Sequence, residues 1–470
     1  MLFNSFFYMF AFLPLSVLGF FVLNKLHLTL FSRIWLVAAS LFFYSWWNIN
    51  YLPLLIGSIL FNYSVLTLLS KESYSNTIVT RKRLMIFGIA VNVAFLGYFK
   101  YTNFFISTFN QVTNANIGLL SLIFPLGISF FTITQITFLV DCYEGLVKKT
   151  NLLNYSLFVT FFPHLIMGPI LHHKDMMPQF DSLRAKVFNK QNLVRGLLLF
   201  TIGLIKKVGI ADMFSSWADY GFDTASTLTL AGAWKTSLSY SLQLYFDFSG
   251  YTDMALGSSL MLNINLPINF NSPYKARNFI EFWQKWHISL TNFITTYLYS
   301  PILKYSKKIT FRRAMLSTYI AMLIAGLWHG ASLLYISFYL LTATGLVVNH
   351  TWRKRKRKMN GILATILTFN FVNIFLVLFR AKSYEAALKV LRGMAGLTGL
   401  GLESFRSDIL QYGAIFIFLM VCFFSKNSME LSDIKTPSLK IVLISLCLLI
   451  TSVIIMIEKN MASEFLYFNF

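Results

Sequence analysis

Charged residues are scarce in this chain of 470 residues, making up 12% of it, whereas a soluble domain carries about a quarter. Hydrophobic residues account for 56% of the chain and aromatic residues for 17%. One soluble core could not bury that much apolar surface, whereas a lipid bilayer accepts helices of about 20 residues that are apolar on every side. The composition therefore predicts an all-α, polytopic membrane protein whose surroundings are the lipid bilayer.

Acidic residues are scarcer than basic ones, and 18 Asp and Glu against 40 Lys and Arg give a net charge of +22. In a soluble protein this excess would suggest a nucleic-acid partner. Here the basic residues form short runs between apolar segments, at 81–83, 148–149 and 353–358. Short basic loops are typical of the cytoplasmic side of a membrane protein, so we expect cytoplasmic anchors and no nucleic-acid partner.

The three cysteines, Cys142, Cys422 and Cys447, have no metal-binding or redox spacing, so no disulfide framework is expected. The chain also lacks a G-x-S-x-G elbow, a P-loop, G-x-G-x-x-G and H-E-x-x-H, which removes the usual support for covalent serine catalysis and nucleotide hydrolysis. His164 and the pair at 172–173 have no carboxylate or Cys to complete a ligand set, so we expect no metal. We expect His164 instead to line a cytoplasmic cavity mouth or to cap a turn.

Apolar segments of helical length are frequent, and we treat the whole chain, 1–470, as one integral-membrane domain. The segments are 7–24, 30–47, 51–70, 84–99, 117–140, 155–171, 194–211, 228–246, 315–330, 332–350, 361–380, 409–425 and 438–457. The stretch 155–171 contains Pro163, Gly168 and Pro169 and has basic residues on both sides, which predicts a broken, re-entrant segment. The amphipathic stretch 381–408 is predicted to be interfacial.

A second irregular region is expected at 247–275, where Asp247 and Asp253 flank the turn-like "FSGYT". The two carboxylates either cap a turn or support a cavity wall. A helix should follow, on which Trp283, His287 and Leu290 share one face by 3.6-residue periodicity.

The motif "GLWHG" at 326–330 places His329 at the end of an apolar stretch. A histidine in hydrocarbon must find a polar partner or stay neutral. A neutral imidazole with a pKa of about 6.5 can take a proton from a hydroxyl. Gly326 and Gly330 would let another group approach, and Trp328 could wall a cavity. The alternative is a core histidine bonded to a backbone carbonyl, with glycines that only pack.

His287 follows Trp286 in "WQKWHISL" and is the second candidate. If the two histidines face one cavity, one of them can act as general base while the other orients the acceptor. The alternative for the second histidine is a place in an interfacial aromatic belt.

Several long stretches together resemble the membrane-bound O-acyltransferase (MBOAT) family, in its bacterial branch that acetylates alginate and peptidoglycan. They are "FPHLIMGPILHHKDMMPQF" at 162–180, "QLYFDFSGYTDMALG" at 243–257, "INFNSPYKARNFIEFWQKWHISLTNFITTYLYSPI" at 268–302 and "GLWHG" at 326–330. The resemblance implies an O-acetyltransferase with an MBOAT-like helical bundle, re-entrant segments and a transmembrane tunnel. It also implies that His329 is the catalytic residue and that His287 is a second functional position.

The same resemblance implies a bacterial cytoplasmic (inner) membrane location and no permanently bound cofactor. The donor would be an acetyl thioester, either acetyl-CoA or an acyl carrier protein. The acceptor would be an extracytoplasmic polysaccharide, reached directly or through an extracytoplasmic acetyltransferase partner. Two alternatives from other classes stay open: a membrane transporter, since carriers also use broken helices, and a non-catalytic scaffold of a polysaccharide-synthesis complex.

Overall fold

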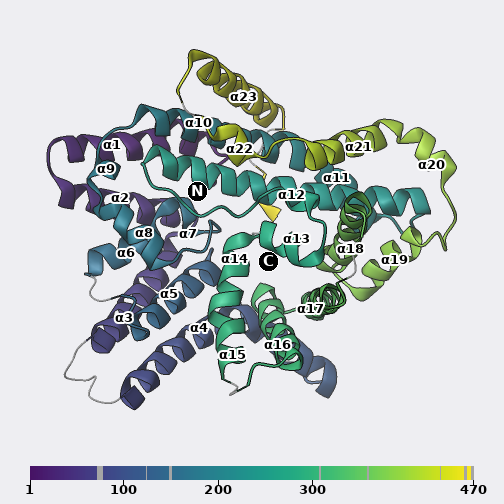
Figure 1. Ribbon diagram of the computed structural model, residues 1–470, viewed down its shortest axis with the longest axis horizontal. Helices are drawn as coiled ribbons and strands as arrows, with labels where there is room; N and C mark the ends of the chain where they lie inside the picture. Colours follow the sequence, from purple (N-terminus) through teal and green to yellow (C-terminus); the bar gives the residue numbers. More distant parts are fainter. Residues whose placement is uncertain are drawn as a thin grey trace. The chain divides into compact units, whose positions relative to one another are not determined.

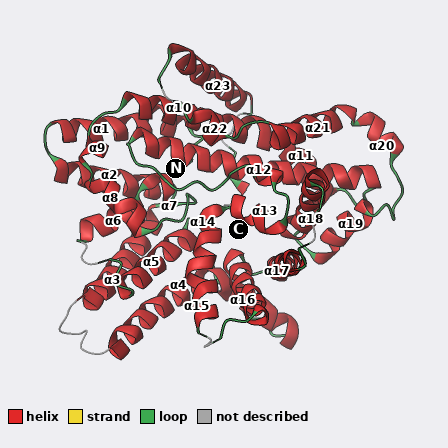
Figure 2. Cartoon of the chain, viewed as in Figure 1, coloured by secondary structure: helices red, strands yellow, loops and turns green. Residues whose placement is uncertain are grey.

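The computed structural model describes the chain except residues 71–77, 123, 148–150, 306–307, 357–358, 435, 460–462 and 467–470. The basic pair 148–149 and the end of the basic run 353–358 therefore lie outside the described residues. Every regular element assigned in the described part of the chain is helical (Figure 2), which confirms the predicted all-α class.

Two compact units emerge from the backbone contacts. Unit 1 comprises Met1–Phe200, Met254–Pro267 and Lys435–Leu443, and unit 2 comprises Thr201–Asp253, Ile268–Ile434 and Ile444–Phe470. The helices that lie wholly in unit 1 are η1 (Tyr8–Phe12), α1 (Leu13–Lys25), α2 (Thr29–Ser45), η2 (Ile49–Tyr51), α3 (Leu52–Ser70), α4 (Ile78–Thr113), α5 (Ile128–Tyr143), α6 (Leu152–Thr160), α7 (Phe162–Leu165), α8 (His173–Asp181) and α9 (Leu183–Lys186).

Unit 2 contains most of the short and irregular helices as well as several long ones. They are η4 (Lys206–Ala211), α11 (Asp212–Asp219), η5 (Tyr220–Thr224), η6 (Pro273–Lys275), α13 (Phe279–Lys285), α14 (Ile288–Phe293), η7 (Ile294–Tyr299), α15 (Ser300–Lys304), α16 (Phe311–His329), α17 (Leu333–Lys354), α18 (Gly361–Arg380), α19 (Tyr384–Met394), α20 (Leu402–Ser407), α21 (Ile409–Phe424) and α22 (Ser428–Ser432). Three helices have residues in both units: α10 (Lys190–Ile205), α12 (Leu230–Met261) and α23 (Leu439–Glu458).

Six helical segments in the described ranges are long and apolar enough to cross a bilayer, which confirms a polytopic membrane protein. They are Tyr8–Lys25, Ile49–Ser70, Thr80–Thr113, Leu333–Lys354, Gly361–Arg380 and Leu439–Glu458. Three further apolar helices, α2, α5 and α21, are shorter. Within the predicted segment 117–140, helix α5 begins at Ile128, directly after Gly127, which has a left-handed backbone with φ of 72°.

The predicted irregular region at 247–275 is wrong in its first half, because α12 continues without interruption to Met261. Its two glycines serve close helix packing instead of a turn. A Cβ atom on Gly250 would lie 2.7 Å from the carbonyl oxygen of Gly203, and one on Gly257 would lie 2.6 Å from that of Gly196. Small residues allow such backbone approach between membrane helices, so α10 and α12 touch along this glycine face.

The stretch 155–171 is interrupted, as its prolines and glycine predict. Helix α6 ends at Thr160, Phe161 has non-helical angles, and the short α7 ends at Leu165. That the segment enters and leaves on one side of the membrane stays a prediction, as does the interfacial place of 381–408.

Helices α16 and α17 lie side by side and are joined by only three residues (Figure 1). Gly330 is extended, and the Ser332 hydroxyl caps α17 by accepting a hydrogen bond of 3.3 Å from the backbone N–H of Leu334. Gly326 sits against α17, since a Cβ atom there would lie 3.2 Å from Cβ of Tyr339 and 3.3 Å from Cα of Ile336. The backbones of α16 and α17 can approach each other here because Gly326 has no side chain.

We predict that Gly326→Val destabilises the protein, because its methyl groups would push against the backbone of α17. Overpacking of this kind costs about 1–3 kcal/mol. Thermal unfolding in detergent measures the effect. Gly413→Ala is the control, since a Cβ atom on Gly413 of α21 would have no described atom within 4 Å and the methyl group should be tolerated. Equal unfolding temperatures for Gly326→Val and the wild type would contradict close packing of α16 on α17.

Candidate active site

His329 is the last residue of α16 and is almost completely buried, with 2% of its surface exposed. Three rings surround its imidazole: Trp328 at a centroid distance of 4.6 Å, Tyr339 at 4.9 Å and Phe379 at 5.9 Å. Gly330, the next residue, packs against the ring of Tyr335, where a Cβ atom would lie 2.5 Å from a ring carbon. The glycines of "GLWHG" thus let α17 close over the histidine.

The hydrogen bonds of His329 define its protonation pattern. Its Nδ1 lies 2.9 Å from the carbonyl oxygen of Ala325, and a carbonyl only accepts, so Nδ1 carries the hydrogen. Its Nε2 lies 3.1 Å from the hydroxyl of Tyr339. In the neutral ring Nε2 is then the acceptor, and Tyr339 donates to it. The basic lone pair of His329 therefore points at Tyr339.

His287 lies at a break in the chain and not within a continuous helix, so the predicted helical face is wrong. Helix α13 ends at Lys285, α14 begins at Ile288, and His287 has a left-handed backbone with φ of 44°. Such a conformation is costly for a residue with a side chain and persists only where its surroundings enforce it. Even so, the imidazole is buried, with 1% exposed, and meets Phe248 edge to face at 4.8 Å.

The loop at 269–271 enforces this break. The backbone N–H of Asn271 donates to Lys285 O, and that of Ile288 donates to Asn269 O, both at 3.0 Å. The Asn269 side chain also accepts from the Ser289 hydroxyl at 2.6 Å. These bonds replace the helical ones lost at the break, and local periodicity gave no sign of them.

A small cavity of about 20 Å³ lies beside His287. Its lining is mostly aromatic and aliphatic: Leu244, Phe279, Phe282, Trp283, Trp286, His287, Leu290, Phe338, Tyr339, Thr342, Val372, Phe375, Leu376 and Phe379. Trp286 lines this cavity together with His287.

Tyr339 connects the two histidines, because it binds His329 and lines the cavity together with His287. Sequence reasoning missed this residue. It lies ten positions after His329 on the next helix, and the only available signal was the short connection between the two apolar segments, which predicts antiparallel neighbours.

Asp247 and Asp253 form ion pairs and do not line the cavity. Asp247 pairs with Lys207 at 2.6 Å, and Asp253 pairs with Lys206 at 2.7 Å. Both carboxylates lie inside α12, so turn capping is wrong for them. Their role in supporting the cavity wall stays a prediction. Leu244, on the same helix, lines the cavity.

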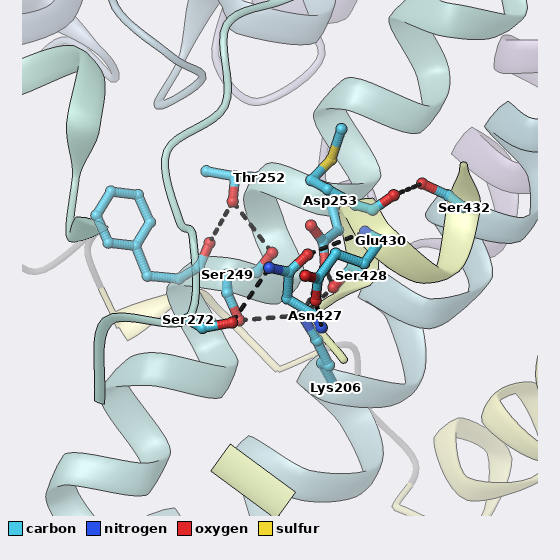
Figure 3. A network of polar contacts seen from close by, with 11 residues as sticks. Lys206, Ser249, Thr252, Asp253, Ser272, Asn427, Ser428, Glu430 and Ser432 are labelled. Carbon is cyan, nitrogen blue, oxygen red and sulfur yellow. Dashed lines mark hydrogen bonds and ion pairs between the residues drawn. The ribbon is translucent and has the colours of Figure 1, made fainter. Parts of the chain in front are cut away.

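Figure 3 shows the network around Asp253. Its carboxylate accepts from Lys206 and, at 2.6 Å, from the Ser428 hydroxyl of α22. Lys206 also donates to Ser428 and, at 3.4 Å, to Ser249. These contacts connect η4, α12 and α22 within unit 2.

His164 belongs to unit 1, where its Nε2 lies 2.9 Å from the carbonyl oxygen of Phe158. It is buried in α7, and its described hydrogen bond is to backbone of the same unit. No group of three or more His, Cys, Asp or Glu side chains suited to a metal occurs in the described part of the chain.

Comparison with known proteins gives a consistent picture. The sequence pattern of the membrane-bound O-acyltransferase family matches residues 119–382. The chain is 42% identical to a peptidoglycan O-acetyltransferase of Helicobacter pylori, over 100% of this chain and 98% of that protein. It is 34% identical to the probable alginate O-acetylase AlgI of Pseudomonas aeruginosa, over 94% of this chain and 84% of that protein. It is also 27% identical to a teichoic acid D-alanyltransferase of Streptococcus thermophilus, over 52% of this chain and 61% of that protein.

We predict that Asp253→Asn destabilises the protein by about 3 kcal/mol, because it leaves the largely buried Lys206 without its carboxylate partner. The double variant Asp253→Asn/Lys206→Met should recover most of this loss, since it removes both charges. Thermal unfolding of both variants in detergent tests this. Glu281→Gln is the control, because its pair with Lys285 is more exposed and should cost less than about 1 kcal/mol. Equal losses for Asp253→Asn and Glu281→Gln would show that burial of the pair is unimportant.

Proposed function

Since this chain belongs to the membrane-bound O-acyltransferase family, and is a membrane O-acetyltransferase, we propose that it takes acetyl groups from a cytoplasmic thioester and passes them across the membrane. The acceptor is an extracytoplasmic polysaccharide. Peptidoglycan is the first acceptor to test, because the peptidoglycan O-acetyltransferase of Helicobacter pylori shares 42% identity along the whole chain. An alginate-like polymer is the second, on the 34% identity to the alginate protein.

The observation that carries the catalytic part is the hydrogen bonding of His329. A thioester is a good electrophile, so the protein must chiefly hold it, exclude water and take a proton from the acceptor hydroxyl. His329 is buried, its Nδ1–H is fixed on Ala325 O, and its Nε2 accepts from Tyr339. This arrangement supports His329 as the general base.

Tyr339 then carries the proton between the acceptor and the base. The acceptor oxygen bonds to the acyl carbon while its proton passes to the Tyr339 oxygen, and the Tyr339 proton passes to Nε2. The carbon–sulfur bond breaks, and the thiolate leaves with the proton that the imidazole gained. Atoms and charge balance, and both side chains return to their starting state.

His287 lines the cavity with Tyr339, which supports its role in orienting the acceptor or intermediate. The polysaccharide receives the acetyl group directly or through an extracytoplasmic acetyltransferase partner, and acetyl-CoA or an acylated carrier protein supplies that group. The site lies in a bacterial cytoplasmic membrane in this proposal.

We predict that His329→Gln lowers O-acetylation by at least 10²-fold, because general-base help is typically worth 10² to 10⁴ in rate. The measurement is alkali-released acetate from the cell-surface glycans of a deletion strain that expresses the variant at wild-type abundance. Wild-type acetate release from His329→Gln would exclude His329 as the base and favour a scaffold. A transporter would instead import labelled acetyl compounds with the thioester intact.

Tyr339→Phe should lower O-acetylation, measured in the same way, at least tenfold. His329 should stay in place, because the substitution keeps the ring and removes only the hydroxyl. Tyr384→Phe is the matched control. That tyrosine of α19 also bonds to α17, at 2.8 Å from the Ser337 hydroxyl, but it is half exposed and does not line the cavity. Equal rates for the two variants would remove Tyr339 from the proton path.

A further inference from the structure

Two polar groups that line the cavity make no hydrogen bond within the described part of the chain. The indole Nε1 of Trp283 and the hydroxyl of Thr342 are buried, and neither has a hydrogen-bond partner within the described ranges. Trp283 is 9% exposed and Thr342 is 0% exposed. Both residues line the cavity beside His287. An unsatisfied buried donor costs about 1–3 kcal/mol, so two of them at one place need an explanation.

Thr342 differs from neighbouring threonines. In helices a threonine hydroxyl commonly donates to the carbonyl one turn earlier. Thr344 does so to Leu340 O at 2.9 Å and Thr351 to Val347 O at 2.8 Å, both on α17. Thr368 of α18 does the same to Ala364 O at 2.7 Å. The hydroxyl of Thr342 makes no such bond, so it is available to another acceptor.

Trp283, Thr342 and Tyr339 line the same cavity. Phe338 and Thr342 are one turn apart on α17, and Tyr339 lies between them in sequence. The Trp283 ring is 6.4 Å from the rings of both Phe338 and Tyr339. The rest of the cavity lining, apart from the histidine and tyrosine, is aromatic or aliphatic and offers few competing acceptors.

The cavity has room for one small polar atom group. Its volume of about 20 Å³ exceeds the roughly 10–15 Å³ that a single water-sized group requires. An indole N–H can only donate, and a hydroxyl can donate, so the matching ligand atom is an acceptor. A carbonyl oxygen accepts two hydrogen bonds and is of this size.

We propose that Trp283 and Thr342 bind the carbonyl oxygen of the acyl thioester and form the oxyanion hole of this enzyme, an inference that rests on the proposed function. When the acceptor oxygen bonds to the acyl carbon, the electron pair of the C=O bond moves onto that oxygen. The two donors stabilise this charge, and the pair returns as the carbon–sulfur bond breaks. Donors fixed in a dry site need no rearrangement during the reaction, which is why such sites are effective.

Thr342→Val tests the proposal, because valine keeps the shape and removes only the hydroxyl. The initial rate of O-acetylation is measured as alkali-released acetate in a deletion strain, at matched protein abundance. We expect a fall of about 10²-fold, the usual effect of losing one such donor. We also expect an unchanged or higher unfolding temperature in detergent, since no protein hydrogen bond is lost. Trp283→Phe, which keeps an aromatic ring, should lower the rate at least tenfold.

Thr368→Val is the matched control, a buried threonine whose hydroxyl has a backbone partner. It should lose stability and keep its rate. A wild-type rate for Thr342→Val or for Trp283→Phe would overturn the proposed pair. A loss of stability in Thr342→Val equal to that of Thr368→Val would also overturn it, because the hydroxyl would then serve the fold, for instance through an ordered water. If the wild-type gene itself restores no acetylation, the proposed function fails as well.

Discussion

The hydrogen bond from Nδ1 of His329 to the carbonyl oxygen of Ala325 is the interaction on which the site depends. It joins a side chain to its own helix one turn earlier, so it needs no distant partner and persists as long as α16 does. By occupying Nδ1 it leaves Nε2 as the basic nitrogen. This basic nitrogen faces the Tyr339 hydroxyl of α17, so any proton that the ring accepts arrives from that side.

Close backbone contact is the second constraint, and glycine provides it. Gly326 brings α17 near enough for the tyrosine hydroxyl to reach the imidazole, and the glycine face of α12 brings α10 near enough for backbone contact. Lys206 and Lys207, which follow α10 directly, can then reach carboxylates on α12. Buried charges are retained here only as pairs, because an unpaired one would cost several kcal/mol.

The sequence predicts correctly the features that depend on local patterns of residues. Apolar runs predict the membrane helices, and a histidine between two such runs points to the site. It is misleading where tertiary contacts decide the backbone. The residues around Gly250 suggest a turn, although this glycine lies inside a helix that needs close packing. The break at His287 depends on bonds from Asn269, which lies 18 positions earlier, and Tyr339 reaches the site only through helix pairing.

Two polar environments in unit 2, the network around Asp253 and the cavity beside His287, differ in how many of their polar groups are already hydrogen-bonded. Around Asp253 the carboxylate Oδ2 accepts from Lys206 of η4 and from Ser428 of α22, so that network stabilises the fold and leaves little for a ligand. At the cavity, the Trp283 indole N–H and the Thr342 hydroxyl have no hydrogen-bond partner within the described ranges. The other two threonines of α17, Thr344 and Thr351, donate to backbone carbonyls one turn earlier. A protein that can satisfy a threonine within its own helix but does not do so gives up stability at that position. That loss is recovered when an acceptor atom enters the cavity, so the free energy missing from the fold becomes available for binding and for the charge that develops during transfer.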